Sequence, residues 1–273
     1  MTLNVRPAAV AGTFYPDKPA TLDESVRMML ETAGRTALPP VKAIIAPHAG
    51  YIYSGPIAAS IYAPLRRQHA SIKRVVLLGP THRVPIDGLA APRCRAFSTP
   101  LGDIPIDRAS IDALADLPQV RLSDAAHAQE HSLEVQLPFL IEVIDHFSLI
   151  PLVVGRASAA EVGEVIERLW GGDETLIVVS SDLSHYLPYD SAIALDSKTA
   201  QSISIFDASI THEQACGATP INGLLHAARQ RRLQARLIDL RNSGDTAGDR
   251  ARVVGYAAFA FFQSPAERTD HAG

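Results

Sequence analysis

Short apolar runs that end in polar, chemically active residues constrain the fold of this chain more than any other feature. Three such runs occupy residues 43–47, 75–81 and 175–181. They lead directly into His48, His82 and Asp182, and His185 lies three residues beyond the last of these. A short apolar run bounded by Gly, Pro or polar residues is typical of a buried strand. Ligands of open α/β sheets bind outside the carboxyl ends of the strands, so these residues predict one shared site.

Candidate strands and helices alternate along most of the chain. The predicted strands are 43–46, 74–79, 148–154, 175–180, 235–240 and 253–262. The predicted helices are 20–32, 55–67, 107–116, 131–144, 158–170, 194–207 and 220–231. This alternation predicts a single α/β domain with a mostly parallel central sheet and helices on both faces. We expect the domain to cover residues 1–263 and to be followed by a polar, disordered tail at 264–273.

Composition and charge exclude several classes of protein. Hydrophobic residues make up 47% of the 273-residue chain and charged residues 20%, which provides ample core material. The net charge of −4 gives no electrostatic reason to expect a nucleic acid or an anionic membrane as partner. The N-terminus lacks the apolar region of a signal peptide, and the longest nearly apolar segment, 253–262, is too short for a membrane-spanning helix. We therefore expect a cytoplasmic protein.

The turn that contains Asp182 and His185 has two interpretations. A carboxylate three residues from an imidazole can hold the ring in one tautomer and leave the other nitrogen free for proton transfer. In the simpler interpretation, Asp182 caps a helix that happens to contain His185. His48 and His82 each follow a strand, and this repetition favours a functional interpretation of both.

Cys216 and the segment Glu130–His131 also leave alternatives open. Cys216 precedes a predicted helix start, a position that lowers a thiol pKa and favours the metal-binding thiolate, although it could simply be a small buried residue. Cys94, between two arginines, is expected to be exposed or structural. Glu130 and His131 either complement the dipole of a helix start or reach the pocket as supporting or substrate-binding groups.

Several familiar motifs are absent from the sequence. It contains no Gly-x-Gly-x-x-Gly after a strand, no P-loop, no His-Glu-x-x-His and no Gly-x-Ser-x-Gly. Nucleotide-dependent chemistry and the common serine hydrolases therefore lose support.

Six ordered motifs resemble those of the Memo family, which in bacteria and archaea is component B of the AmmeMemoRadiSam system. The resemblance extends from about residue 5 to residue 262. The motifs lie at residues 10–16, 47–51, 78–82, 130–134 and 180–185, and at Cys216-Gly217 with Pro220-Ile221.

This resemblance implies a fold similar to that of the class III extradiol dioxygenases, which are non-haem iron enzymes. It implies that His48, His82 and Cys216 are metal ligands. Those dioxygenases bind Fe(II) through two His and one carboxylate, whereas the third ligand here would be a thiolate. A softer ligand shifts the preference toward copper or zinc and changes the redox behaviour of iron, so ring cleavage does not follow from the fold.

The resemblance also places other residues in the same pocket. Asp182 and His185 would line it, with His185 as general base, and Phe14 and Tyr15 would form a wall. The leading hypothesis is a redox-active metalloprotein that holds one transition metal ion, with iron(II) or copper favoured and zinc possible. It would act on an unidentified small molecule and with other AmmeMemoRadiSam components. The alternatives are a dioxygenase on an aromatic diol, a non-catalytic module that binds a peptide or partner, and a zinc hydrolase.

Overall fold

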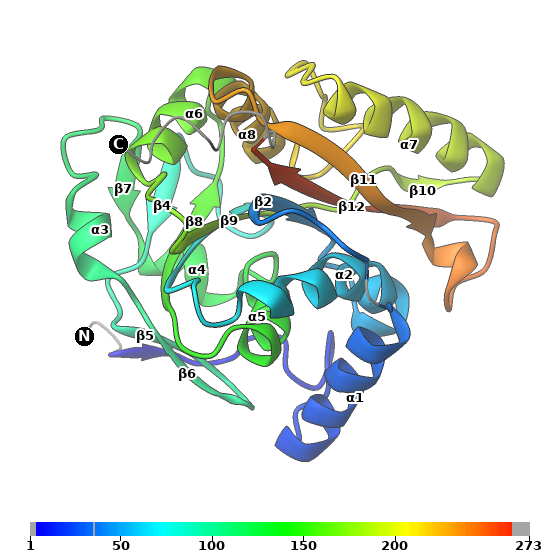
Figure 1. The fold of residues 1–273 in the computed structure, drawn as a ribbon, viewed down its shortest axis with the longest axis horizontal. Coiled ribbons are helices and arrows are strands. Elements are labelled where there is room, and N and C mark those ends of the chain that lie inside the picture. Colours follow the sequence, from blue (N-terminus) through cyan, green and yellow to red (C-terminus); the bar gives the residue numbers. More distant parts are fainter. Residues whose placement is uncertain (1–3, 35, 264–273) are drawn as a thin grey trace.

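A mixed sheet forms the centre of the molecule (Figure 1). The structure, a computed structural model, describes residues 4–34 and 36–263, and nine strands of this part make up the sheet. Their order is β10-β12-β2-β9-β3-β8-β4-β7, and β11 also pairs with β12. The strands are β2 Val41–Ala46, β3 Arg74–Pro80, β4 Leu89–Ala91, β7 Val120–Leu122, β8 Ser148–Val154, β9 Thr175–Ser180, β10 His185–Leu187, β11 Gln234–Asn242 and β12 Val253–Phe262.

The middle of this sheet is parallel, and the strands on either side of it join it in antiparallel pairs. Strands β2, β9, β3 and β8 run in one direction, while β12 pairs antiparallel with β2, and β4 pairs antiparallel with β8. All six residues of β9 are buried, as expected for a strand covered on both faces. Because β2, β9 and β3 are parallel neighbours, the loops that follow them leave the sheet at the same edge.

Helices cover both faces of the sheet (Figure 1). On one face α1, α2 and α5 pack together, and on the other α6 packs against α8, while α7 packs on β11 and β12. The helices are α1 Pro19–Thr32, α2 Tyr51–Leu65, α3 Arg108–Asp112, α4 Asp124–Ala128, α5 Leu137–Val143, α6 Ala159–Arg168, α7 Tyr189–Ser204 and α8 Ala218–Gln230, with short 3-10 turns at Arg66–Gln68, Glu134–Gln136 and Ser243–Asp245. The predicted α/β architecture with helices on both faces is confirmed.

A small second sheet fixes the N-terminal segment beside the site. Its strands are β1 Val5–Arg6, β5 Ala96–Thr99 and β6 Gly102–Pro105, in the order β1-β5-β6. Arg6 at the end of β1 is buried and forms an ion pair with Glu134 at 2.6 Å. Its guanidinium also donates hydrogen bonds to the carbonyl oxygens of His127 and Glu130. These contacts fasten the turn that carries His131.

All six predicted strands are present, but several helix boundaries differ. Residues 131–133 lie in a turn, and α5 begins only at Leu137 because Pro138 lacks the N–H needed to continue a helix through it. Thr21 does not cap α1, which begins at Pro19 after Lys18. The capping box predicted at Ser158 is present, with reciprocal hydrogen bonds to Glu161.

Among the described residues, none of the helices has both the length and the apolar character needed to cross a bilayer. The predicted tail at 264–273 lies outside the described residues.

Candidate metal centre

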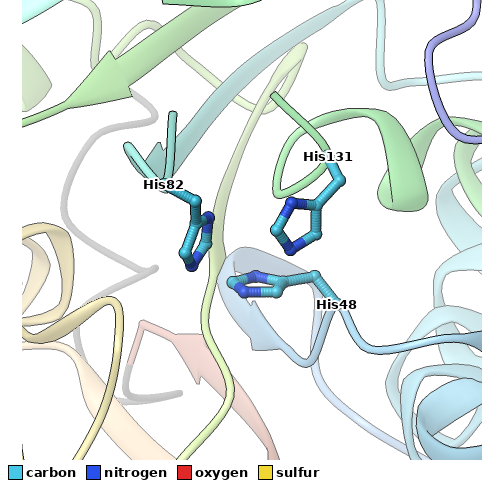
Figure 2. A group of neighbouring side chains, drawn as sticks. All are labelled: His48, His82 and His131. Carbon is cyan, nitrogen blue, oxygen red and sulfur yellow. The ribbon is translucent and has the colours of Figure 1, made fainter. Parts of the chain in front are cut away.

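Three histidines converge at the carboxyl edge of the parallel strands (Figure 2). His48 follows β2, His82 follows β3, and His131 lies in the turn after α4. One ring nitrogen of each lies within 4.8 Å of the corresponding nitrogens of the other two. The sequence predicted that His48 and His82 share a site, and the parallel register of β2, β9 and β3 brings them together.

A saturated hydrogen-bond network fixes the tautomer of His48. The Ser180 hydroxyl donates its only hydrogen to the Ser132 carbonyl at 2.6 Å and accepts from Gln136 Nε2 at 2.8 Å. Its remaining lone pair must therefore accept from His48 Nδ1, which lies 2.8 Å away. The His48 Nε2 is thus an unprotonated donor atom for a metal. Burial, together with the neighbouring His131, lowers the pKa of His48 well below its usual value and keeps the ring neutral.

Glu130 orients His82 in the same way. Its carboxylate accepts the His82 backbone N–H at 2.6 Å and His82 Nδ1–H at 2.9 Å, and it also accepts the Ser132 N–H. Burial opposes ionisation, but the hydrogen bonds from His82 and Ser132 lower the pKa of Glu130 to about 2. A carboxylate on Nδ1 leaves Nε2 free to coordinate, which is the usual support for a metal-bound histidine. The predicted supporting role of Glu130 therefore has a definite geometry.

His131 belongs to the histidine cluster itself, whereas the sequence predicted a supporting or substrate-binding role for it. Its ring lies 4.4 Å from that of His82 and 5.4 Å from that of His48, between centroids. Its Nδ1 has no hydrogen-bond partner among the described residues, although Glu130 Oε1 is 3.5 Å away. Burial and the neighbouring His82 lower the pKa of His131 to about 4, so the ring is neutral at pH 7. A neutral imidazole is the form that binds metal.

Cys216 lies beside His48, although the group of donor atoms that all lie within 4.8 Å of one another consists of the three histidines alone. Its Sγ lies 3.4 Å from His48 Nε2. Two donors that share one tetrahedral ion at ordinary Zn–N and Zn–S bond lengths lie about 3.6 Å apart, so this spacing fits a common metal. The sequence predicted a lowered thiol pKa, and this is wrong for the protein without metal. Burial and the charge of Asp182 raise the pKa of Cys216 to about 12 and outweigh the helix start at Ala218.

Asp182 and His185 are not paired as predicted. The Asp182 carboxylate accepts the backbone N–H of His48 at 2.7 Å, and burial raises its pKa to about 6. His185 Nδ1–H instead donates to the Leu183 carbonyl at 2.8 Å, which leaves Nε2 free. The expected tautomer of His185 is thus set by the backbone, while Asp182 holds the loop of His48. A carbonyl two residues away provides the acceptor because the chain turns back on itself there.

The two predicted wall residues occupy different places. The Phe14 ring lies 4.7 Å from the His131 ring, between centroids, and so contacts the cluster directly. Tyr15 is buried and its hydroxyl donates to Glu134 at 2.6 Å. Tyr15 therefore belongs to the same supporting network as Arg6. Cys94 is buried and distinct from the cluster, in agreement with a structural role.

A cleft opens beside the cluster. Its volume is about 770 Å³, and its lining includes His82, Cys216 and His212. This size matches that of ordinary small-molecule sites. His82 and Cys216 therefore face a space that a substrate can enter.

Fold and site together define an α/β protein with a candidate metal centre of three histidines, His48, His82 and His131, at the carboxyl edge of its parallel strands. This chain belongs to the Memo family, whose sequence model, described as Memo-like protein, matches residues 6–260. It is 35% identical to a MEMO1 family protein of Ignicoccus hospitalis, over 94% of this chain and 98% of the relative. It is 34% identical to a MEMO1 family protein of Aquifex aeolicus, over 95% of this chain and all of the relative.

A solved structure shows the same fold at low sequence identity. An uncharacterized protein of Escherichia coli K12 superposes with a TM-score of 0.52 at 14% identity, and the match covers 80% of this chain and 99% of that one. The family model and the relatives, and not this structure, confirm over nearly the whole chain the resemblance to the Memo family predicted from six motifs.

Sequence reasoning missed the residues that hold the donors in place. Ser180 and Gln136 fix His48, and Arg6 with Glu134 fastens the turn of His131. One signal was available, since Ser180 directly precedes Ser181 and Asp182 at the end of a predicted strand. Arg6 carried no local signal, because its partner Glu134 lies 128 residues away.

Proposed function

We propose that this protein binds one transition metal ion through His48, His82 and Cys216 and uses it in redox chemistry. The observation that carries the proposal is the fixed tautomer of both histidines, which turns two unprotonated Nε2 atoms toward one volume. Iron(II) or copper is favoured because zinc has no redox chemistry; the soft thiolate shifts the preference toward copper, and zinc is compatible with the same donors. The bound ion would supply the electron transfer and Lewis acidity that no side chain of the site provides.

The protein contributes proton handling and orientation. His185 Nε2 is free because Nδ1 donates to the Leu183 carbonyl, so the ring can take a proton from a substrate. Asp182 holds the backbone of the His48 loop, and Glu130 holds the ring of His82. In this proposal His185 is the general base, and Asp182 acts by positioning a ligand.

The number of protons released on metal binding shows whether Cys216 or His131 is the third ligand. A thiol with a pKa of about 12 must lose its proton to bind metal, whereas neutral His131 has none to lose at pH 8. Isothermal titration with Zn²⁺ in two buffers of different ionisation enthalpy counts the protons released per ion. We expect the wild type to release about one proton more than Cys216→Ser. Both proteins also report any proton lost by metal-bound water, so the difference between them counts the thiol proton alone.

Equal proton release by both proteins would assign the third position to His131. Cys94→Ser is the matched control, since Cys94 is buried away from the cluster, and it should bind metal like the wild type. Failure of the wild type to bind any transition metal under reducing conditions would refute the metalloprotein proposal itself.

Metal identity and reaction require a separate measurement. Anaerobic purification followed by elemental analysis identifies the ion, and oxygen uptake on a panel of catechols tests dioxygenase activity. Iron or copper at about one equivalent supports redox chemistry. Zinc alone, with no response to the panel, would favour hydrolysis.

We further propose that the protein acts with the other components of an AmmeMemoRadiSam-type system. Membership of the Memo family supports this proposal. Co-expression of the tagged protein with a radical-SAM component from the same genome, followed by affinity purification under argon, tests it. Recovery of the tagged protein alone, with no change in metal content, would count against the association.

A further inference from the structure

The cleft beside the cluster has apolar walls and an uneven charge. Pro80, Val84, Pro85 and Ile86 line it together with Val154 from the end of β8. Among the described residues that line the cleft, Asp87 is the only carboxylate, and Arg83 and Arg156 are the two guanidinium groups. Substrate recognition therefore depends on how these three charges are paired.

Asp87 is already paired with Arg156. Arg156 Nη2 lies 2.6 Å and Nε 2.8 Å from Asp87 Oδ1. Arg83, by contrast, forms no hydrogen bond and no ion pair with any residue of the described part of the chain. The cleft thus holds one positive charge that the protein itself does not neutralise.

The backbone of Arg83 is held next to the metal-binding group. The preceding residue, His82, is fixed through its backbone N–H by Glu130 at 2.6 Å. The Thr81 hydroxyl donates to the Val84 carbonyl at 2.6 Å and closes the turn around Arg83. A guanidinium that starts from this turn can reach a ligand that also contacts His82 and Cys216, the other donors facing the cleft.

Arg83 is exposed to the solvent of the cleft and has no anionic partner, and the nearby Glu130 carboxylate is already engaged by His82 and Ser132. An unpaired cation beside a metal ion adds some repulsion, which water weakens. An incoming carboxylate removes the repulsion and fits the planar, two-pronged donor geometry of arginine.

We propose that Arg83 binds the carboxylate of a small-molecule substrate whose other end contacts the metal. The proposal rests on the proposed function, because it assumes a metal held by His48, His82 and Cys216. It adds a substrate class, namely small carboxylic acids that carry a separate metal-binding oxygen. Arg156 does not bind the substrate carboxylate in this proposal, because its guanidinium already forms an ion pair with Asp87.

Two pairs of hydroxamate probes test this proposal. The 3- and 4-carboxybenzohydroxamates carry a metal-binding group and a carboxylate, and the corresponding carboxamides are neutral and nearly the same shape. Titration into the zinc-loaded protein gives the ratio of the two dissociation constants for each pair. We expect the wild type to prefer at least one carboxylate over its carboxamide by about tenfold or more, the usual scale for a charge-assisted hydrogen bond.

The variants separate charge recognition from metal binding. Arg83→Gln should bring the preference close to one while leaving carboxamide affinity and zinc content unchanged, and Arg83→Lys should keep part of it. Arg67→Gln, a matched change at an exposed arginine outside the cleft, should behave like the wild type.

Loss of the preference only in Arg83→Gln supports the proposal. A metal-loaded wild type without a preference in either pair, or an Arg83→Gln protein that retains it, would overturn the role of Arg83 and leave the metal site standing. A wild type that holds no metal would instead refute the proposed function, and this inference with it.

Discussion

Replacement of Glu130 by Gln should weaken both the fold and the metal site. The carboxylate accepts three hydrogen bonds, two from His82 and one from Ser132, and it is buried. An amide keeps only one accepting oxygen, so its NH₂ group must face at least one of these donors. The native pKa of about 2, against an ordinary value of 4.5, corresponds to about 3 kcal/mol of stability at pH 7. We therefore expect Glu130→Gln to lower the free energy of unfolding by about 2–3 kcal/mol.

The effect on metal binding follows from the loss of the hydrogen bond between His82 Nδ1–H and the Glu130 carboxylate. Without a carboxylate on Nδ1, the ring loses its orientation and part of its basicity, which typically lowers metal affinity by about 10- to 100-fold. Urea denaturation of the metal-free protein measures the first effect, and zinc titration measures the second. Glu142→Gln is a matched control, because Glu142 pairs with the exposed side chain of Arg27 and should cost less than about 1 kcal/mol.

The pH dependence of Glu130→Gln provides an independent check. Glu130 has a lowered pKa in the fold, so its contribution is present above pH 4.5 and is lost as the pH falls through 2. The difference in unfolding free energy between wild type and variant should therefore shrink from pH 7 to pH 3. A variant with unchanged stability and unchanged zinc affinity at pH 7 would show that the hydrogen bonds of Glu130 do not organise the site.

Three further perturbations test other parts of the site. Arg6→Ala leaves Glu134 buried without its cation and should lower the unfolding free energy by about 3–5 kcal/mol in urea denaturation; a loss below 1 kcal/mol would contradict this. Burial lowers the pKa of His127 to about 4, so its contribution is present above pH 6.5 and lost as the pH falls through 4. His127→Gln should therefore flatten the loss of stability between pH 6.5 and 4, and an unchanged pH profile would refute that origin. His185→Ala should retain its metal, by elemental analysis, and lose about a hundredfold of any activity, whereas His82→Ala should lose both; an emptied site in His185→Ala would make His185 a ligand.

The parallel strands and two of the donors could be predicted because both depend on local sequence. Apolar runs identified β2, β3, β8 and β9, since a strand buried on both faces needs little but hydrophobic residues. His48 and His82 follow such runs directly. Parallel pairing of the strands then places both histidines at the same edge of the sheet, and this placement does not depend on the other segments of the chain.

The supporting contacts could not be predicted because they join segments distant in sequence. Glu130 and His82 are 48 residues apart, and His48 and Ser180 are 132 apart. His131 was assigned to a regular helix, whereas the Glu130 carboxylate binds the Ser132 N–H and shapes a turn in its place. The burial of Cys216 likewise depends on how α8 packs on the sheet, which no local pattern reveals.

The high pKa of Cys216 does not prevent it from binding a metal, but it adds the free-energy cost of removing the thiol proton. Removal of a proton from a thiol of pKa about 12 at pH 7 costs about 7 kcal/mol. The apparent binding free energy of a complete structural zinc site is about 10–16 kcal/mol at that pH, so a full set of ligands can offset this cost and leave appreciable affinity. Without metal the thiol stays protonated, and of its two acceptors, His48 Nε2 at 3.4 Å and the Asp182 carbonyl at 3.7 Å, the nearer is the very atom that a metal would bind. Sulfur and imidazole thus hold each other in place by a hydrogen bond until a metal ion replaces the proton between them.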